Sequence, residues 1–147
     1  MAEAARYAAA IVGIDDADDA CQEAWMRIWR AWENADPERL DAWAFRIVRN
    51  SCIDRLRLRR PATTLTDDLV APASVEDVVL PRLEVDDALR ILEHLPVALR
   101  ETLWLREVGE LSYAEIAEIQ GVPLGTVMSR LNAGRRKLAK LLRRQGP

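Results

Sequence analysis

Apolar side chains recur at helical spacing over most of the chain, and this pattern predicts an all-α protein. We expect helices over residues 3–12, 16–34 and 39–59 in the first part. The apolar face of the second helix comprises Cys21, Trp25, Ile28 and Trp32, and the buried arc of the third comprises Leu40, Trp43, Ala44, Ile47 and Val48. Four of the five tryptophans lie between residues 25 and 43. We assign them chiefly to the core, with base stacking by one of them as the alternative.

The polar faces of the same helices carry two informative groups of side chains. One side of the second helix presents, at the spacing i, i+3, i+4, i+7, the residues Asp19, Gln22, Glu23 and Met26. A solvated face usually explains such a set, but a methionine among carboxylates indicates a surface for a partner. The third helix gathers, within about a third of its circumference, Arg46, Arg49, Asn50 and Arg57.

The middle of the chain differs in composition from both ends. Residues 61–81 contain three prolines, several hydroxyl side chains and little helical periodicity, which predicts a linker after a boundary near Arg60. The helical pattern returns at Val85 and continues after Pro96. We therefore expect two small helical domains, residues 1–60 and 85–147, joined by an acidic, proline-containing linker over 61–84.

The C-terminal domain contains the signals of a helix-turn-helix. Ser112 and Glu115 have the spacing of a capping box, Gly121 suits a left-handed helix end, and Pro123 suits the start of the next helix. That second helix should run to about Leu142. Its apolar side is expected to comprise Leu124, Val127, Leu131, Leu138 and Leu142, and its polar side Thr126, Ser129, Arg130, Arg136, Lys137 and Lys140. Hydroxyls near the start and cations further along are typical of a helix that enters the major groove. An ordinary helical hairpin is the alternative.

Charge along the chain favours a DNA partner. The net charge is −3, which by itself argues against nucleic-acid binding. However, residues 42–60 hold six basic and one acidic side chain, and residues 124–147 hold seven basic side chains and no acidic one. Two basic segments on either side of an acidic one indicate two contacts with the same polyanion.

Other features exclude several classes of protein. Cys21 and Cys52 do not have metal-ligand spacing, and both fall on apolar stripes, so we expect two reduced, packed thiols in a cytoplasmic protein. His94 is the only histidine and stands at a predicted helix end, where a capping or surface role is expected. There is no zinc-type cluster and no glycine-rich phosphate loop, so we expect no metal, no cofactor and no enzymatic activity. No secretory signal or membrane-spanning run is visible.

Both basic segments, in this order with a linker between them, resemble the extracytoplasmic-function (ECF) sigma factors of bacterial RNA polymerase. The segment from Asp18 to Trp25 is similar to the part of that family that docks on the β′ clamp helices of the polymerase core. The segment from Trp43 to Arg57 is similar to the helix that binds the −10 element. Leu95 to Tyr113 and Gly125 to Leu131 are similar to the entry and recognition helices that bind the −35 element.

The resemblance implies a role for each group of polar residues. The −10 contacts would come from Arg46, Arg49, Asn50 and Arg57, with Asn50 close to an unstacked base. The −35 contacts would come from Thr126, Ser129, Arg130, Asn132, Arg136 and Lys137, and the contacts to the polymerase core from Asp19, Gln22, Glu23 and Met26. The implied partners are RNA polymerase core, through its β′ clamp helices and β flap, promoter DNA and an anti-sigma factor. No cofactor is implied.

The chain also departs from the family's pattern. Met128, Asn132 and Ala133 stand where relatives commonly carry basic or aromatic residues, the first helix looks short, and the sequence predicts no fused C-terminal regulatory domain. The first rival hypothesis is a stand-alone helix-turn-helix regulator that binds duplex DNA without polymerase. The second is a protein-interaction module, for which the charges of residues 124–144 would be dispensable.

Overall fold

Helices are the only regular secondary structure over the residues that the structure describes. The computed structural model describes residues 2–59 and 84–145, so the predicted linker lies outside them apart from Glu84. The N-terminal unit comprises α1 (Ala2–Val12), α2 (Ile14–Ala31), two short 3-10 turns, η1 (Trp32–Asn34) and η2 (Pro37–Arg39), and α3 (Leu40–Arg59). The C-terminal unit comprises α4 (Val85–Leu92), α5 (Val97–Leu103), the π-helical segment η4 (Trp104–Val108), α6 (Tyr113–Gln120) and α7 (Leu124–Gln145). The predicted all-α fold is confirmed.

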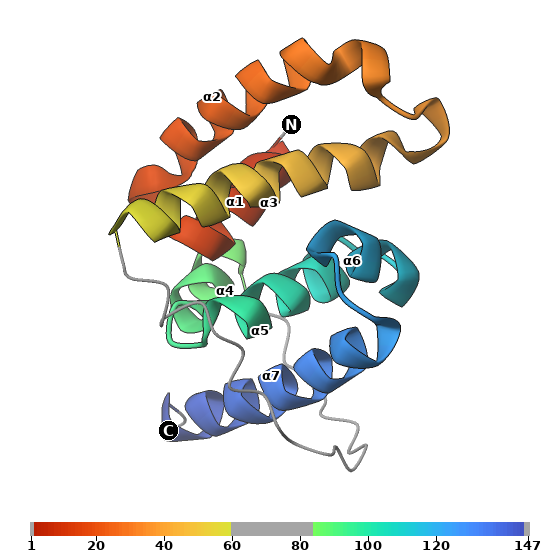
Figure 1. Ribbon diagram of the computed structural model, residues 1–147. Coiled ribbons are helices and arrows are strands. Elements are labelled where there is room, and N and C mark those ends of the chain that lie inside the picture. Colours follow the sequence, from red (N-terminus) through yellow and green to blue (C-terminus); the bar gives the residue numbers. More distant parts are fainter. Residues whose placement is uncertain (1, 60–83, 146–147) are drawn as a thin grey trace.

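In the N-terminal unit, α1 packs against both α2 and α3, which run side by side (Figure 1). The inner face of α2 is built mostly from small side chains: Ala17, Ala20, Cys21, Ala24 and Ile28. The facing helix α1 is itself rich in alanine, and its residues from Tyr7 to Val12 are all buried. Small side chains on both helices allow the close approach that this packing requires.

This packing contradicts the tryptophan core expected from the sequence. Trp25, Trp29 and Trp32 are 39%, 85% and 58% exposed, and Leu40 is 37% exposed. The alanine-rich stripe of α2 faces α1, which turns the side of α2 that carries the indole rings towards solvent. Trp43 lies edge-on to Trp32, with ring centroids 6.2 Å apart, and is half-buried.

The predicted capping box and left-handed turn of the helix-turn-helix are confirmed in the C-terminal unit. The Ser112 hydroxyl accepts a hydrogen bond from the Glu115 amide, and the Glu115 carboxylate accepts one from the Ser112 amide. Gly121 ends α6 in the left-handed conformation at φ 65°, which glycine adopts without steric cost. Ile116 of α6 packs in the core with Val127 and Leu131 of α7.

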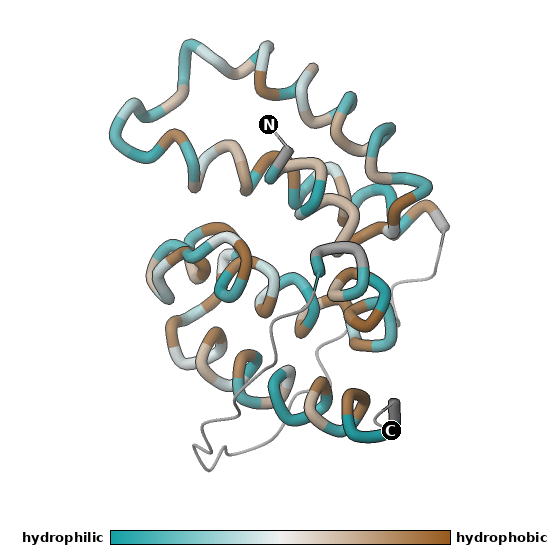
Figure 2. The backbone as a smooth tube through the Cα atoms, turned by 180° about the vertical axis from the view of Figure 1, so that it is seen from behind, coloured by the Kyte–Doolittle hydropathy of each residue, from teal (hydrophilic) through white to brown (hydrophobic). Residues whose placement is uncertain are grey.

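The hydrophobic core continues across the junction between the two units. Tyr7 of α1, Phe45 of α3 and Trp104 of η4 form an aromatic cluster across the junction, with ring centroids 5.3 to 6.2 Å apart. Helix α1 contacts α5 and η4, and α3 contacts α6. Figure 2 shows the apolar positions gathered on the inner sides of the helices of both units.

Candidate nucleic-acid and partner interfaces

The predicted −10-binding residues lie along one side of α3, as the sequence indicates. Arg46, Asn50 and Arg57 are exposed. Arg49 differs from them, because it borders the C-terminal unit and its side chain is only 20% exposed. Three of the four candidates are therefore accessible in this structure, and the fourth is held by another helix.

Arg49 forms a bidentate ion pair with Glu101 of α5. Its Nε lies 2.9 Å from Oε2 and 3.2 Å from Oε1 of Glu101, and its Nη2 lies 3.1 Å from Oε1. The Tyr7 hydroxyl donates a further hydrogen bond of 3.0 Å to Glu101 Oε2. The Glu101 side chain is only 1% exposed, so these two partners compensate a charge removed from water.

The surroundings of this cluster shift the pKa of two of its members. Burial, followed by the nearby Glu101 carboxylate, raises the pKa of Tyr7 well above its ordinary range, so the phenol stays protonated and donates. Burial is the largest single effect on the pKa of Arg49 and lowers it. The attraction to Glu101 and the hydrogen bonds between the two side chains together outweigh burial, so the pKa of Arg49 is raised. Neighbouring Cys52 is also buried, and burial raises its thiol pKa to about 12. Cys21 and Cys52 are both free and buried, as predicted.

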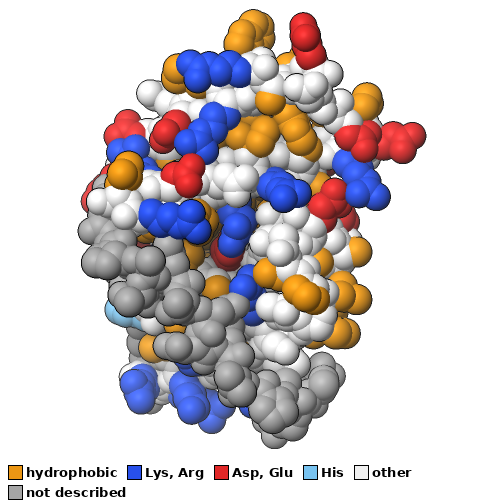
Figure 3. Space-filling view, viewed as in Figure 1, with side chains coloured by type: hydrophobic (Ala, Val, Ile, Leu, Met, Phe, Trp, Pro, Cys, Tyr) orange, Lys and Arg blue, Asp and Glu red, His pale blue; other side chains and the backbone are white. Residues whose placement is uncertain are grey.

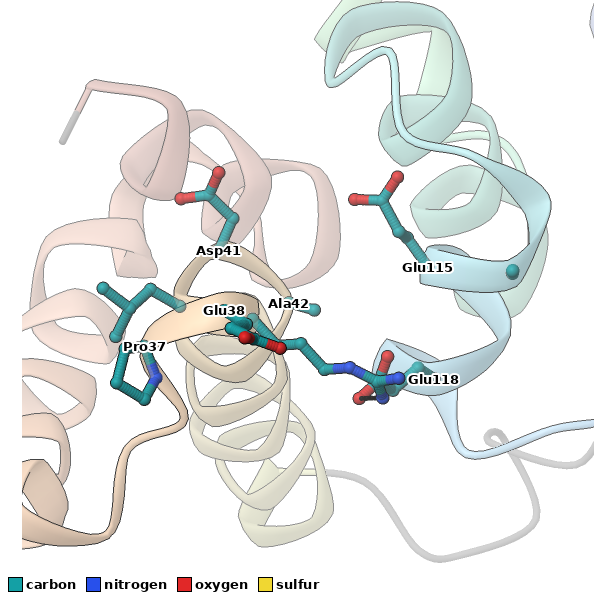
Figure 4. Close-up of a pocket in the computed structure, with 9 residues that line it drawn as sticks. Pro37, Glu38, Asp41, Ala42, Glu115 and Glu118 are labelled. Carbon is teal, nitrogen blue, oxygen red and sulfur yellow. Dashed lines mark hydrogen bonds and ion pairs between the residues drawn. The ribbon is translucent and has the colours of Figure 1, made fainter.

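A second contact between the units spans an open cleft. Arg39 Nη1 of η2 lies 3.0 Å from Glu118 Oε1 of α6, and both side chains are largely exposed. The cleft has a volume of about 540 Å³ and is lined by Pro37–Ala42 on one side and by Ala114, Glu115 and Glu118 on the other. Figure 4 shows Asp41 and Glu115 on its opposite walls. Its acidic walls make the cleft unsuitable for a nucleic acid.

The recognition helix α7 presents most of its predicted polar residues to solvent. Lys137 is exposed, and the half-exposed positions are Thr126, Ser129, Asn132 and Arg136. The Ser129 hydroxyl donates to the Gly125 carbonyl at 3.0 Å and keeps its acceptor lone pairs towards solvent. Figure 3 shows Lys and Arg side chains gathered at the lower edge, over the C-terminal end of α7.

Arg130 does not belong to this exposed face. It is 7% exposed, and its Nη1 donates to the Gln120 side-chain oxygen at 3.0 Å. Gln120 in turn donates to the Thr102 hydroxyl at 2.7 Å, so one buried polar chain joins α5, α6 and α7. The assignment of Arg130 to the solvent-facing side was wrong, because its position on the helix wheel lies at the edge of the stripe that packs on α6.

The start of α7 exposes two apolar side chains that were not expected on its polar side. Leu124 and Met128 are 48% and 47% exposed. Leu124 was expected in the apolar stripe, but it is the first residue of the helix and remains half-exposed. Apolar side chains at this end of a recognition helix are suited to contact thymine methyl groups.

The polar face of α2 has the composition predicted for a partner surface. Asp19, Gln22, Glu23 and Met26 are all exposed. Asp19 lies 3.1 Å from Arg55 of α3, and Glu23 lies 3.4 Å from Arg27 one turn further along α2, so only the Asp19 pair joins two helices. Trp29, which the sequence pattern placed in the core, is 85% exposed, one turn from Met26 on the same helix. Its spacing of i+4 from Trp25 and i+3 from Met26 was the available signal.

Three further observations concern metal binding, the single histidine and membrane insertion, within the described residues. No group of three or more His, Cys, Asp or Glu side chains there is placed to hold a metal ion. His94 is exposed in the turn after α4, which agrees with the surface position expected. Among residues 2–59 and 84–145, no helix has the length and apolar character needed to span a bilayer.

Comparison with known sequence families matches both units. Sigma-70 region 2 matches residues 2–61, and sigma-70 region 4 matches residues 86–138. The ECF RNA polymerase sigma factor SigW of Bacillus subtilis is 32% identical over 145 residues, which cover 88% of this chain and 77% of SigW. The ECF sigma factor SigM of the same organism is 30% identical over 131 residues, covering 87% of this chain and 80% of SigM.

Solved structures agree with these matches. The sigma factor RpoE of Bartonella quintana, crystallised with the anti-sigma factor NepR, superposes with a TM-score of 0.75 at 28% identity, covering 95% of this chain and 89% of RpoE. CnrH in complex with the cytosolic domain of CnrY superposes with a TM-score of 0.69 at 27% identity, covering 99% of this chain and 82% of CnrH. The chain therefore belongs to the ECF RNA polymerase sigma factors, which are transcription initiation factors and not enzymes.

Proposed function

We propose that this chain binds RNA polymerase core in the cytoplasm and directs it to promoters that carry a −10 and a −35 element. The observation that supports this most strongly is the presence of two separate helices, α3 and α7, with exposed basic side chains, in a chain whose α2 exposes Asp19, Gln22, Glu23 and Met26. A regulator that bound DNA only through α7 would need neither of the other two surfaces.

The −10 strand would lie along α3. Arg46 and Arg57 would contact phosphates, and Asn50 would hydrogen-bond an unstacked base, at a cost of a few kcal/mol for unstacking. Arg49 would join them once it is released from Glu101. This assignment rests on the resemblance of residues 43–57 to the family's −10-binding helix. The exposure of Arg46, Asn50 and Arg57 on one side of α3 supports it.

The −35 duplex would receive the N-terminal part of α7 in its major groove. Thr126, Ser129 and Asn132 would reach base edges, and Arg136 and Lys137 would contact phosphates. The polymerase core would bind the face of α2 that carries Asp19, Gln22, Glu23 and Met26. Trp29 extends this face with a large apolar area of the kind that anchors protein interfaces.

The test is run-off transcription with purified core on a pool of promoter fragments. We expect transcripts that depend on the added protein and share a −35/−10 pair. Arg46→Glu and Lys137→Glu should each abolish them, whereas Arg6→Glu and Arg90→Glu, which reverse exposed charges on α1 and α4, should leave them unchanged. If core stayed silent while the protein alone shifted duplex DNA, the stand-alone regulator would be the correct function.

An anti-sigma factor is a further expected partner. The two structural neighbours described above were both solved with one, NepR in one case and the cytosolic domain of CnrY in the other. Affinity purification of this chain from its native cells should recover a small inhibitor as well as polymerase subunits. Recovery of polymerase subunits alone would remove this partner from the proposal.

A further inference from the structure

The ion pair between Arg49 and Glu101 connects the proposed −10-binding helix to the unit that carries the recognition helix. Its three N–O distances lie between 2.9 and 3.2 Å, and both Nε and Nη2 of Arg49 take part. A guanidinium binds a carboxylate and a phosphate with the same two-pronged geometry. The edge of Arg49 that would grip a DNA phosphate is therefore already occupied by Glu101.

We propose that Glu101 is an internal competitor of the −10 strand, which holds the free chain in a closed form and must release Arg49 before this strand binds. This rests on the proposed function of α3. In this proposal Glu101, which lies in α5 and not in α3 or α7, controls when Arg49 can bind the −10 strand.

Because Glu101 is buried, Arg49 can be released only by a movement of one whole unit relative to the other. A rotation of the Arg49 side chain alone would leave the Glu101 carboxylate, 1% exposed, with only the Tyr7 hydroxyl as partner. An uncompensated buried charge of this kind is strongly unfavourable. Release of Arg49 therefore requires that water reach Glu101, which happens when the C-terminal unit separates from both α1 and α3. The closed and open forms are then two discrete states.

The other contacts between the two units do not hold a DNA-binding group. Arg39 and Glu118 are 62% and 39% exposed, and such a pair contributes little to stability in water. The aromatic cluster of Tyr7, Phe45 and Trp104 contributes apolar contact but does not compete for a DNA-binding group. Glu101 is therefore the residue that links closure to occupation of the −10 face.

Glu101→Gln tests the proposal, because it keeps the shape of the side chain and an acceptor for Tyr7 but removes the charge that holds Arg49. The free full-length protein is examined by small-angle X-ray scattering and by fluorescence anisotropy with a labelled single-stranded 24-mer of random sequence. The wild type should have a radius of gyration of about 15 Å, as expected for a compact chain of this length. Glu101→Gln should be larger by several ångströms.

The same variant should bind the single strand at least about tenfold more tightly, since apparent affinity rises with the open fraction. Glu107→Gln is the matched control, because it also removes one negative charge from the C-terminal unit. Glu107 pairs with Arg135, 2.8 Å away in the same unit, so its loss should change neither the radius of gyration nor the affinity for the single strand. Arg49→Ala combined with Glu101→Gln should open the chain without the full gain in affinity, because the phosphate-binding group is then missing.

An unchanged radius and affinity in a folded Glu101→Gln protein would overturn the proposal, and so would an equal gain from Glu107→Gln. If Glu101→Gln does not fold, Tyr7→Phe removes one hydrogen bond from Glu101 and should give a smaller gain of about threefold, also through the open fraction. No gain from it would then overturn the proposal. Run-off transcription separates the two hypotheses: if the wild type supports transcription while Glu101→Gln leaves radius and affinity unchanged, only the internal competitor is refuted.

Discussion

The buried polar chain through Gln120 gives the sharpest test of how the recognition helix is held. Gln120 is 6% exposed, accepts a hydrogen bond from Arg130 and donates one to Thr102. Gln120→Leu keeps a side chain of similar size and removes both bonds. A hydrogen bond from a charged donor contributes about 1.5–3 kcal/mol, and a neutral one about 1 kcal/mol. We therefore expect the free energy of unfolding to fall by about 3 kcal/mol.

The assay is urea denaturation at pH 7, followed by circular dichroism at 222 nm. For a chain of this size, a loss of about 3 kcal/mol corresponds to a melting temperature lower by roughly 6–12 °C. Gln120→Glu is the matched variant, because its carboxylate still accepts from Arg130 and loses only the donor to Thr102, so its cost should be clearly smaller. A Gln120→Leu protein within about 0.5 kcal/mol of the wild type would show that Arg130 does not depend on this chain.

Four further predictions concern other parts of the molecule. Gly134→Ala would place a methyl group 3.0 Å from a buried leucine of α5 and should cost about 1–3 kcal/mol, whereas Gly125→Ala, with nothing within 4 Å, should gain up to about 1 kcal/mol in the same urea titration. Ser112→Ala removes the capping box and should cost about 1 kcal/mol by urea denaturation. The folded-state pKa of Cys52 is raised, so its contribution to stability is complete below pH 9 and is lost as pH rises towards 12, which melting temperatures across that range would reveal as a steady decline. Trp29→Ala should leave unfolding unchanged, because the ring is 85% exposed, but should weaken binding to polymerase core at least about tenfold in a pull-down titration.

Local signals predicted the parts of the fold that depend on neighbouring residues. The capping box at Ser112 and the left-handed turn at Gly121 are each determined by a few adjacent positions, and both appeared where the sequence placed them. The exposure of Trp25 and Trp32 could not be predicted in this way. Helix α2 has apolar side chains on two faces, and its packing against α1 and α3 determines which of them is buried.

The same limit applies to the candidate site. The basic face of α3 was visible from helical spacing, but its partner Glu101 lies 52 residues away from Arg49 in the chain. Neither charge pattern nor periodicity indicates that this one carboxylate, among many, would be buried against this one arginine. Arg130 was predicted to be exposed and is buried. It lies at the edge of the apolar stripe, where exposure depends on how far the neighbouring helix extends, and a helix wheel does not contain that information.

The contact between Tyr7 and the C-terminal unit also constrains how the chain can fold as it is synthesised. Tyr7 is completely buried, yet its hydrogen-bond partner Glu101 follows 94 residues later. Until the ribosome has made α5, the side of α1 that carries Tyr7 has no surface to pack against. Contacts of such long sequence separation form late and slowly. That side of α1 therefore stays uncovered, and open to chaperones, until α5 has left the ribosome.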